Sequence, residues 1–207
     1  MDISKIFPFL FINECVVCGK EGEGAICNEC KKTLFVKGRA KTLMGNPLYF
    51  ITIYRLKGEK LINEIKRGKV SPIPYLIEES LKLIEHERID IVVAVPSMGF
   101  LFSYIPEHLL LMGKGIARRL NIRYLPIIEK VKRIKSQTTL SPQERMRNPL
   151  GAFKLKMGAE KIIKDKRILI IDDVYTSGAT MRECEREIMR FGGSSLSLVI
   201  SKTSLFS

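Results

Sequence analysis

The chain has 207 residues, enough for one sizeable domain and a small additional module, and 45% of them are hydrophobic. Its 35 Lys and Arg outnumber 22 Asp and Glu, and the net charge of +13 favours polyanionic partners, whether phosphorylated small molecules or nucleic acid. No apolar run approaches the roughly 20 residues needed to span a bilayer, so we expect no membrane insertion.

The first residues contain a short apolar patch, Ile6 to Ile12. Asp2 precedes this patch, Pro8 interrupts it, and no small-residue cleavage site follows, so a secretory signal is not expected. We therefore predict a cytoplasmic protein.

Four of the five cysteines form two Cys-x2-Cys pairs that are separated by eight residues. Glycines within this segment permit the tight backbone that lets four sulfur atoms converge on one tetrahedral metal ion. Two disulfides are the alternative, but the absence of a secretory signal favours metal. We predict a structural zinc site with the ligands Cys15, Cys18, Cys27 and Cys30.

The next segment, residues 31–45, is basic and weakly patterned, and we interpret it as a linker or as the second half of the zinc module. We therefore divide the chain into a zinc-binding module with its linker, residues 1–45, and a larger domain, residues 46–207. The larger domain begins with an expected strand, Leu48 to Tyr54.

A short helix is expected next, with an apolar stripe formed by Leu61, Ile62 and Ile65. It ends in Lys66, Arg67, Gly68 and Lys69. On its own, such a charged run is most simply a solvated helix end with a glycine cap.

Helices and strands then alternate. We predict an amphipathic helix over Ile73 to Glu87, a buried strand over Ile91 to Val95, a helix over Glu107 to Leu120 and a strand over Ile122 to Ile128. Backbone amides in the turn at Pro96 to Gly99 could hold an anionic group. The alternation predicts an α/β fold with a mostly parallel sheet.

The segment from Glu129 to Arg147 is basic and polar and has no strong periodicity. A long loop of this kind inside a compact domain tends to be a lid or a binding loop, although an ordinary exposed loop is the alternative. The basic residues of this loop that could contact an anionic ligand are Lys130, Arg133 and Lys135.

The sequence RILIIDDVYTSGAT, residues 167–180, combines a buried strand, an acidic pair, a loop of small and hydroxyl residues, and the start of a helix that we expect to run to about Phe191. Ligands of parallel sheets bind at the carboxyl ends of strands, and unpaired amides at a helix start favour phosphate. The loop residues expected to hold that phosphate are Thr176, Ser177, Gly178, Ala179 and Thr180.

The acidic pair, Asp172 and Asp173, would repel a phosphate. Carboxylates at this point suit a sugar diol beside the phosphate, or a hydrated magnesium ion. A diol and a phosphate together describe a ribose 5-phosphate. The alternative is a buried strand followed by a capped helix whose aspartates are only solvated.

The stretch IIDDVYTSGAT resembles the phosphoribosyl pyrophosphate (PRPP) signature of type I phosphoribosyltransferases. Together with the four cysteines, YRLKGEKLINEIKRGK, VVAVPS and SQTTLSPQERMRNPLGAF, it resembles the ComF family of late-competence proteins over nearly the whole chain. That resemblance implies a phosphoribosyltransferase-type fold with an N-terminal zinc ribbon. The chain departs from the family between Pro96 and Leu109, where Met98 to Pro106 is largely apolar.

The resemblance also implies the chemistry. Asp172 and Asp173 would hold the ribose hydroxyls while magnesium and basic groups neutralise the departing pyrophosphate. Candidates for contact with the pyrophosphate are Lys66, Arg67, Ser97, Lys130, Arg133 and Lys135. Superfamily members that act on 6-oxopurines place an acidic residue where this chain has Thr176, which argues against hypoxanthine or guanine as the acceptor.

Two functions follow. The first is a magnesium-dependent phosphoribosyltransferase with an unknown nitrogenous acceptor. The second, implied by the family's association with competence, is a DNA-uptake accessory that binds single-stranded DNA and keeps the PRPP pocket for binding only. The resemblance alone implies a helicase-type protein partner for this second function.

Overall fold

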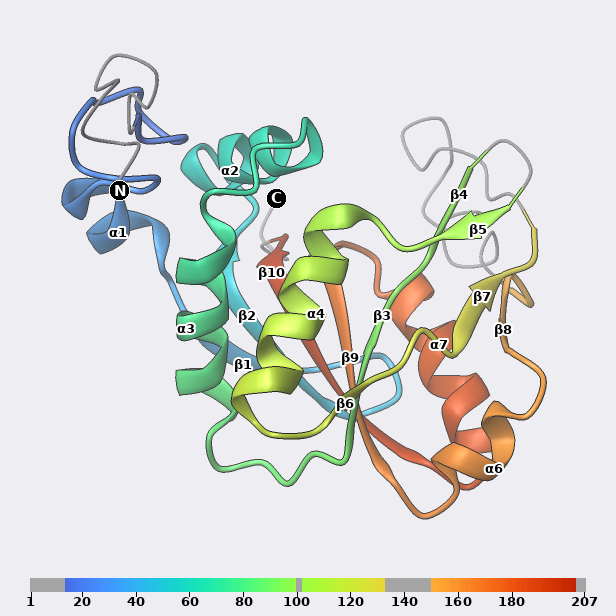
Figure 1. Cartoon of the computed structure of the whole chain (residues 1–207). Coiled ribbons are helices and arrows are strands. Elements are labelled where there is room, and N and C mark those ends of the chain that lie inside the picture. The colour runs from blue at the N-terminus through green and yellow to red at the C-terminus, as the bar shows by residue number, and fades with distance from the viewer. Residues whose placement is uncertain (1–13, 100–101, 133–149, 204–207) are drawn as a thin grey trace, which may run out of the picture.

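A six-stranded sheet runs through the computed structural model, which describes residues 14–99, 102–132 and 150–203 (Figure 1). The strand order is β1-β2-β10-β9-β3-β6, and all neighbouring pairs are parallel except the antiparallel pair of β1 and β2. The strands are β1 (Gly38–Lys41), β2 (Pro47–Ile53), β3 (Ile91–Ala94), β6 (Arg123–Tyr124), β9 (Arg167–Tyr175) and β10 (Ser194–Lys202). The predicted α/β fold with a mostly parallel sheet is therefore confirmed.

Helices cover both faces of this sheet (Figure 1). On one face, α3 (Ile73–Ile84) and α4 (Glu107–Arg119) pack on side chains such as Val92 and Leu169, which alternate along their strands. On the other face, α6 (Ala159–Ile163) and α7 (Ala179–Arg190) enclose a second apolar core. Strands buried on both faces are rich in aliphatic residues because each face needs its own apolar contacts.

Shorter elements surround the carboxyl ends of the strands. Helix α2 (Lys57–Lys66) follows β2, and two small antiparallel ribbons pair β4 (Ser97–Met98) with β5 (Ser103–Tyr104) and β7 (Ile128–Lys130) with β8 (Phe153–Leu155). The side-chain hydroxyl of Ser103 accepts a 2.9 Å hydrogen bond from the backbone N–H of Lys130, which ties the two ribbons together.

The four-cysteine segment packs on the larger domain. Its helix α1 (Asn28–Leu34) and the buried residues Val16 and Ile26 belong to the same apolar core as α2 and α3. Strand β1, within the predicted linker, joins the central sheet. Among the described residues, no helix combines the length and the apolar character that crossing a bilayer requires.

Several elements differ from their predicted form. The strand predicted from Ile122 to Ile128 is divided between β6 and β7, with residues 125–127 between them. Strand β9 continues through the acidic pair to Tyr175 instead of closing at Asp173. Strand β10, which lies next to β9 in the centre of the sheet, was not among the predicted elements.

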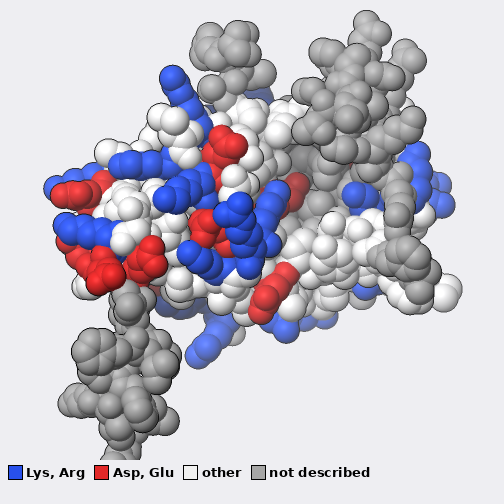
Figure 2. All heavy atoms as spheres, turned by 90° about the horizontal axis from the view of Figure 1, so that it is seen from above, with Lys and Arg blue, Asp and Glu red and all other residues white. Residues whose placement is uncertain are grey.

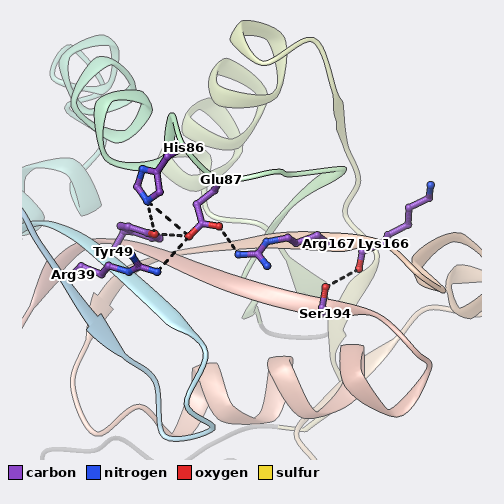
Figure 3. Close-up of polar contacts among 7 residues, drawn as sticks. All are labelled: Arg39, Tyr49, His86, Glu87, Lys166, Arg167 and Ser194. Carbon is purple, nitrogen blue, oxygen red and sulfur yellow. Dashed lines mark hydrogen bonds and ion pairs between the residues drawn. The ribbon is translucent and has the colours of Figure 1, made fainter.

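A partly buried polar cluster lies near the amino ends of β2 and β9 (Figure 3). The hydroxyl of Tyr49 donates a 2.5 Å hydrogen bond to Glu87, and Arg167, at the start of β9, pairs with the other oxygen of the same carboxylate. Burial alone would raise the pKa of Glu87, but the hydrogen bond from Tyr49 and the charge of Arg167 outweigh it and hold that pKa below its ordinary value. The cluster therefore joins β2, β9 and the turn after α3 near the amino ends of the two strands.

Candidate functional site

A cavity of about 310 Å³ opens at the carboxyl ends of β3 and β9. Because Ala94 pairs with Ile171 in the sheet, the turn after β3 lies beside the acidic pair of β9. The lining of this cavity contains both predicted aspartates and all five residues of the predicted phosphate loop. The other lining residues are Lys66, Val95, Pro96, Ser97, Pro106, Leu109, Lys130, Phe153, Val174, Tyr175 and Met181.

The loop between β9 and α7 has the features of an anion cradle. Gly178 precedes the first turn of α7 with φ +74°, and no side chain among the described residues caps that helix, so its first N–H groups face the loop. The hydroxyl oxygen of Ser177 is buried and has no hydrogen-bond partner within the described part of the chain. A phosphate would supply partners for both kinds of donor.

The two adjacent carboxyl groups differ in charge state. Burial and the neighbouring charge of Asp173 raise the pKa of Asp172 to about 8. Burial would also raise the pKa of Asp173, but His108 and Lys66 outweigh it, so that the pKa of Asp173 lies below its ordinary value. Near neutral pH the pair therefore carries about one negative charge.

Lys66, at the end of α2, reaches the site. Its Nζ lies 2.9 Å from Oδ2 of Asp173, and its side chain remains 47% exposed. Arg67 follows it in sequence but turns away and pairs with Glu64 at 2.7 Å, and it is not among the described residues that line the cavity.

Two other predicted residues line the cavity: Ser97, on β4, and Lys130, on β7. Burial lowers the pKa of Lys130, whose Nζ lies 5.5 Å from the ring centre of Phe153. The two remaining cationic candidates, Arg133 and Lys135, lie outside the described residues, as does most of the predicted basic loop.

The apolar stretch from Met98 to Pro106 forms much of the ribbon of β4 and β5, apart from residues 100–101, which lie outside the described part. Pro106 lines the cavity and also a neighbouring second hollow of about 450 Å³, and Asp173 lines both. This second hollow is lined by His108, from the first turn of α4, which was not among the site residues predicted from the sequence. Its only signal in the sequence is a histidine in the first turn of the predicted helix that begins at Glu107.

The four N-terminal cysteines converge as predicted. Their sulfur atoms all lie within 4.8 Å of one another, and all four residues are free cysteines. Four thiol sulfurs at this spacing could bind a metal ion such as zinc. The remaining cysteine, Cys184, belongs to α7 and is buried on the face of that helix that packs on the sheet.

Comparison with known proteins identifies relatives of the larger domain. The profile of the phosphoribosyl transferase domain matches residues 76–202. An adenine phosphoribosyltransferase of Brachyspira hyodysenteriae is 30% identical over 106 residues, which make up 51% of this chain and 54% of that protein. One from Methanococcus maripaludis is 28% identical over 130 residues, 62% of this chain and 67% of that protein.

The chain thus matches between half and two thirds of the length of these curated relatives. Among solved structures, the adenine phosphoribosyltransferase of Thermoanaerobacter pseudethanolicus aligns with a TM-score of 0.44 and 16% identity, over 84% of this chain and 98% of that one.

Proposed function

Because the chain belongs to the phosphoribosyl transferase domain family, we propose that its cavity binds PRPP and that the protein transfers the 5-phosphoribosyl group to a nitrogenous acceptor. The observation that supports this most directly is the unpartnered, buried hydroxyl of Ser177 at the uncapped start of α7, beside two carboxyl groups. A ribose 5-phosphate offers a partner to each of these groups.

In this proposal the 5-phosphate accepts hydrogen bonds from Ser177, from Thr180 and from the first backbone amides of α7. The positive φ of Gly178 lets the chain turn around the phosphate. The ribose hydroxyls then lie over the end of β9, where Asp172 and Asp173 accept or share their hydrogen bonds.

The pyrophosphate would lie near the turn after β3, towards Ser97 and the ammonium groups of Lys66 and Lys130. As the bond from ribose C1 to the pyrophosphate oxygen lengthens, positive charge develops on the sugar and negative charge on the leaving group. Magnesium, when bound with the pyrophosphate, would add further positive charge there. The acceptor nitrogen bonds to C1 as the pyrophosphate leaves with the electron pair of the broken C1–O bond, and the proton released from that nitrogen passes to water.

Thermal unfolding tests binding. PRPP with magnesium at about 100 times its dissociation constant should add about 2.7 kcal/mol of stability, and the double variant Asp172→Asn, Asp173→Asn should lose most of that gain. Exchange of Ser201, whose buried hydroxyl lies on β10 outside the cavity lining, for Ala provides the control. An identical gain in the double variant would refute the proposed site.

Release of pyrophosphate on addition of candidate bases tests transfer. Adenine is the first acceptor to try, because the curated relatives reported above are adenine phosphoribosyltransferases. Thr176 stands where an acidic partner for a 6-oxopurine would be expected, so hypoxanthine and guanine should be poorer acceptors.

Zinc is the metal proposed for the four cysteines, with a structural role, because four thiolates leave no open coordination position. This module, placed before a phosphoribosyl transferase domain, is also what supports assignment to the ComF family within the wider family.

A second candidate function is binding of single-stranded DNA as a cytoplasmic competence accessory, which the net charge of +13 favours. Seen from above, Lys and Arg gather near the middle of the face, but acidic side chains are interspersed among them (Figure 2). Affinity for single strands that falls log-linearly with salt would support this function. The alternative outcome, no binding at about 0.1 M salt, would leave the phosphoribosyl function alone.

A further inference from the structure

His108 is a buried side chain beside the acidic pair. The residue is 7% exposed, and its Nε2 lies 3.4 Å from Oδ2 of Asp173. Within the described residues this nitrogen has no hydrogen-bond partner, so the contact is close but not aligned as a hydrogen bond. A buried imidazole nitrogen without a hydrogen-bond partner is unusual, and a hydrogen bond that forms when a ligand binds would explain it.

The same carboxylate oxygen also contacts Lys66, but the two neighbours differ in freedom. The side chain of Lys66 is 47% exposed and that of His108 only 8%. A flexible, exposed ammonium group can move towards an incoming pyrophosphate, whereas a packed imidazole cannot. When Lys66 moves, His108 is the neighbour that stays beside Asp173.

His108 contacts Asp173 within the second hollow and not within the first cavity. It lines the second hollow, together with Tyr104 and Glu107, and is not among the described residues that line the first cavity. Asp173 itself lines the first cavity, so His108 can contact it without occupying the space of a ligand there.

We propose that His108 is a positioning residue, which holds the carboxylate of Asp173 in the orientation that accepts hydrogen bonds from the ribose hydroxyls. This inference rests on the proposed function. His108 touches neither the sugar nor the leaving group and acts only through Asp173. Hydrogen bonds in ligand-free sites are often long and tighten when the ligand binds, which accounts for the unpartnered nitrogen.

Calorimetric titration with two probes tests this role. Inorganic phosphate needs only the loop at the start of α7, whereas ribose 5-phosphate also needs Asp173. His108→Leu keeps a similar side-chain volume but removes the nitrogen atoms. It should therefore lower the affinity for ribose 5-phosphate by about 10- to 100-fold and leave the affinity for phosphate unchanged. A variant that does not fold would instead lose affinity for both probes.

Two conservative variants test which nitrogen acts. The amide nitrogen of His108→Gln can take the place of Nε2, whereas that of His108→Asn takes the place of Nδ1. The Gln variant should therefore recover ribose 5-phosphate affinity to within about threefold of the parent protein, and the Asn variant should not. His86→Gln, at the other histidine of the chain, whose side chain is 54% exposed, is the control for loss of an imidazole.

The outcomes separate the two proposals. If the parent protein binds ribose 5-phosphate tightly and the Leu variant binds it equally well, the positioning role is wrong and the proposed function stands. If the parent protein binds ribose 5-phosphate no better than phosphate, both fail. Equal losses for both probes in a Leu variant with an unchanged melting temperature would also overturn the positioning role.

Discussion

Asp172 and Asp173 are consecutive residues near the end of β9, yet the pKa values of their carboxyl groups are shifted in opposite directions. Burial and the charge of Asp173 raise the pKa of Asp172 to about 8. Despite burial, His108 and Lys66 hold the pKa of Asp173 below its usual range. A site that binds a sugar diol gains from this difference, because one carboxyl group can donate a hydrogen bond while the other accepts.

Asp172→Asn should stabilise the protein without its ligand. A carboxyl group whose pKa is raised in the folded state is protonated in both states below about pH 4 and does not affect stability there. As the pH rises towards 8, it lowers the free energy of unfolding, because only the unfolded state ionises readily. The gain of the Asn variant should therefore grow across that window and reach at least about 1 kcal/mol at pH 8. Melting temperatures at pH 5, 6.5 and 8 measure it.

Asp173→Asn is the matched control, and its effect should have the opposite sign. A carboxylate whose pKa is depressed adds stability above its unfolded value, near pH 4, and loses it as the pH falls through the folded value. This variant should therefore be less stable than the parent protein at pH 7. Equal effects of the two Asn variants would contradict the assigned charge states.

Gly178→Ala should both destabilise the fold and abolish phosphate binding. The residue has φ +74°, and a Cβ there would collide with the hydroxyl of Tyr175. Gly45→Ala is the control, because Gly45 has φ +82° but open space around it. The control should cost about 1 kcal/mol in urea denaturation, and Gly178→Ala clearly more. Equal losses would mean that the contact with Tyr175 is unimportant.

How much of this site could be predicted depends on how local each feature is. The acidic pair and phosphate loop are consecutive residues, so their chemistry was legible in the sequence, as was the spacing of the four cysteines. His108 was missed because its partner Asp173 is far away in sequence and only the packing of α4 on the sheet brings them together. Arg67 was a candidate equal to Lys66, yet its ion pair with Glu64 directs it elsewhere.

Strand β10 shows a further limit of sequence patterns. Serines interrupt its aliphatic run, although Ser195, Ser197 and Ser201 are buried like their apolar neighbours. Ser197 donates a 3.1 Å hydrogen bond to the buried carboxyl group of Glu185 on α7, which satisfies both groups. A polar pair of this kind cannot be recognised before the sheet order is known.

Glu87→Gln should destabilise the fold without affecting ligand binding. The side chain is 8% exposed and pairs with Arg167, so loss of its charge should cost about 2 kcal/mol at pH 7. Because the pKa of Glu87 is depressed, the difference should shrink as the pH falls below about 4.5. Urea denaturation at pH 7 and pH 4 checks this, and a change in PRPP affinity would contradict the separation of this cluster from the site.

Removal of metal from the four-cysteine site should unfold the N-terminal segment and weaken the main core. Residues next to the cysteines, such as Val16 and Ile26, pack in the same core as α2. A chelator should therefore lower the melting temperature, and added zinc should restore it. Cys184→Ser, which changes the fifth cysteine, should leave the response to chelator intact; a parent protein indifferent to chelator would exclude the zinc site.

The most direct measurement is a crystal structure of the protein with PRPP and magnesium. We predict the 5-phosphate within hydrogen-bond distance of Ser177 and the first amides of α7, and the ribose hydroxyls on Asp172 and Asp173 with Lys66 moved towards the pyrophosphate. The central claim would be contradicted if PRPP were bound elsewhere, or if residues 176–180 made no contact with it at saturating concentration.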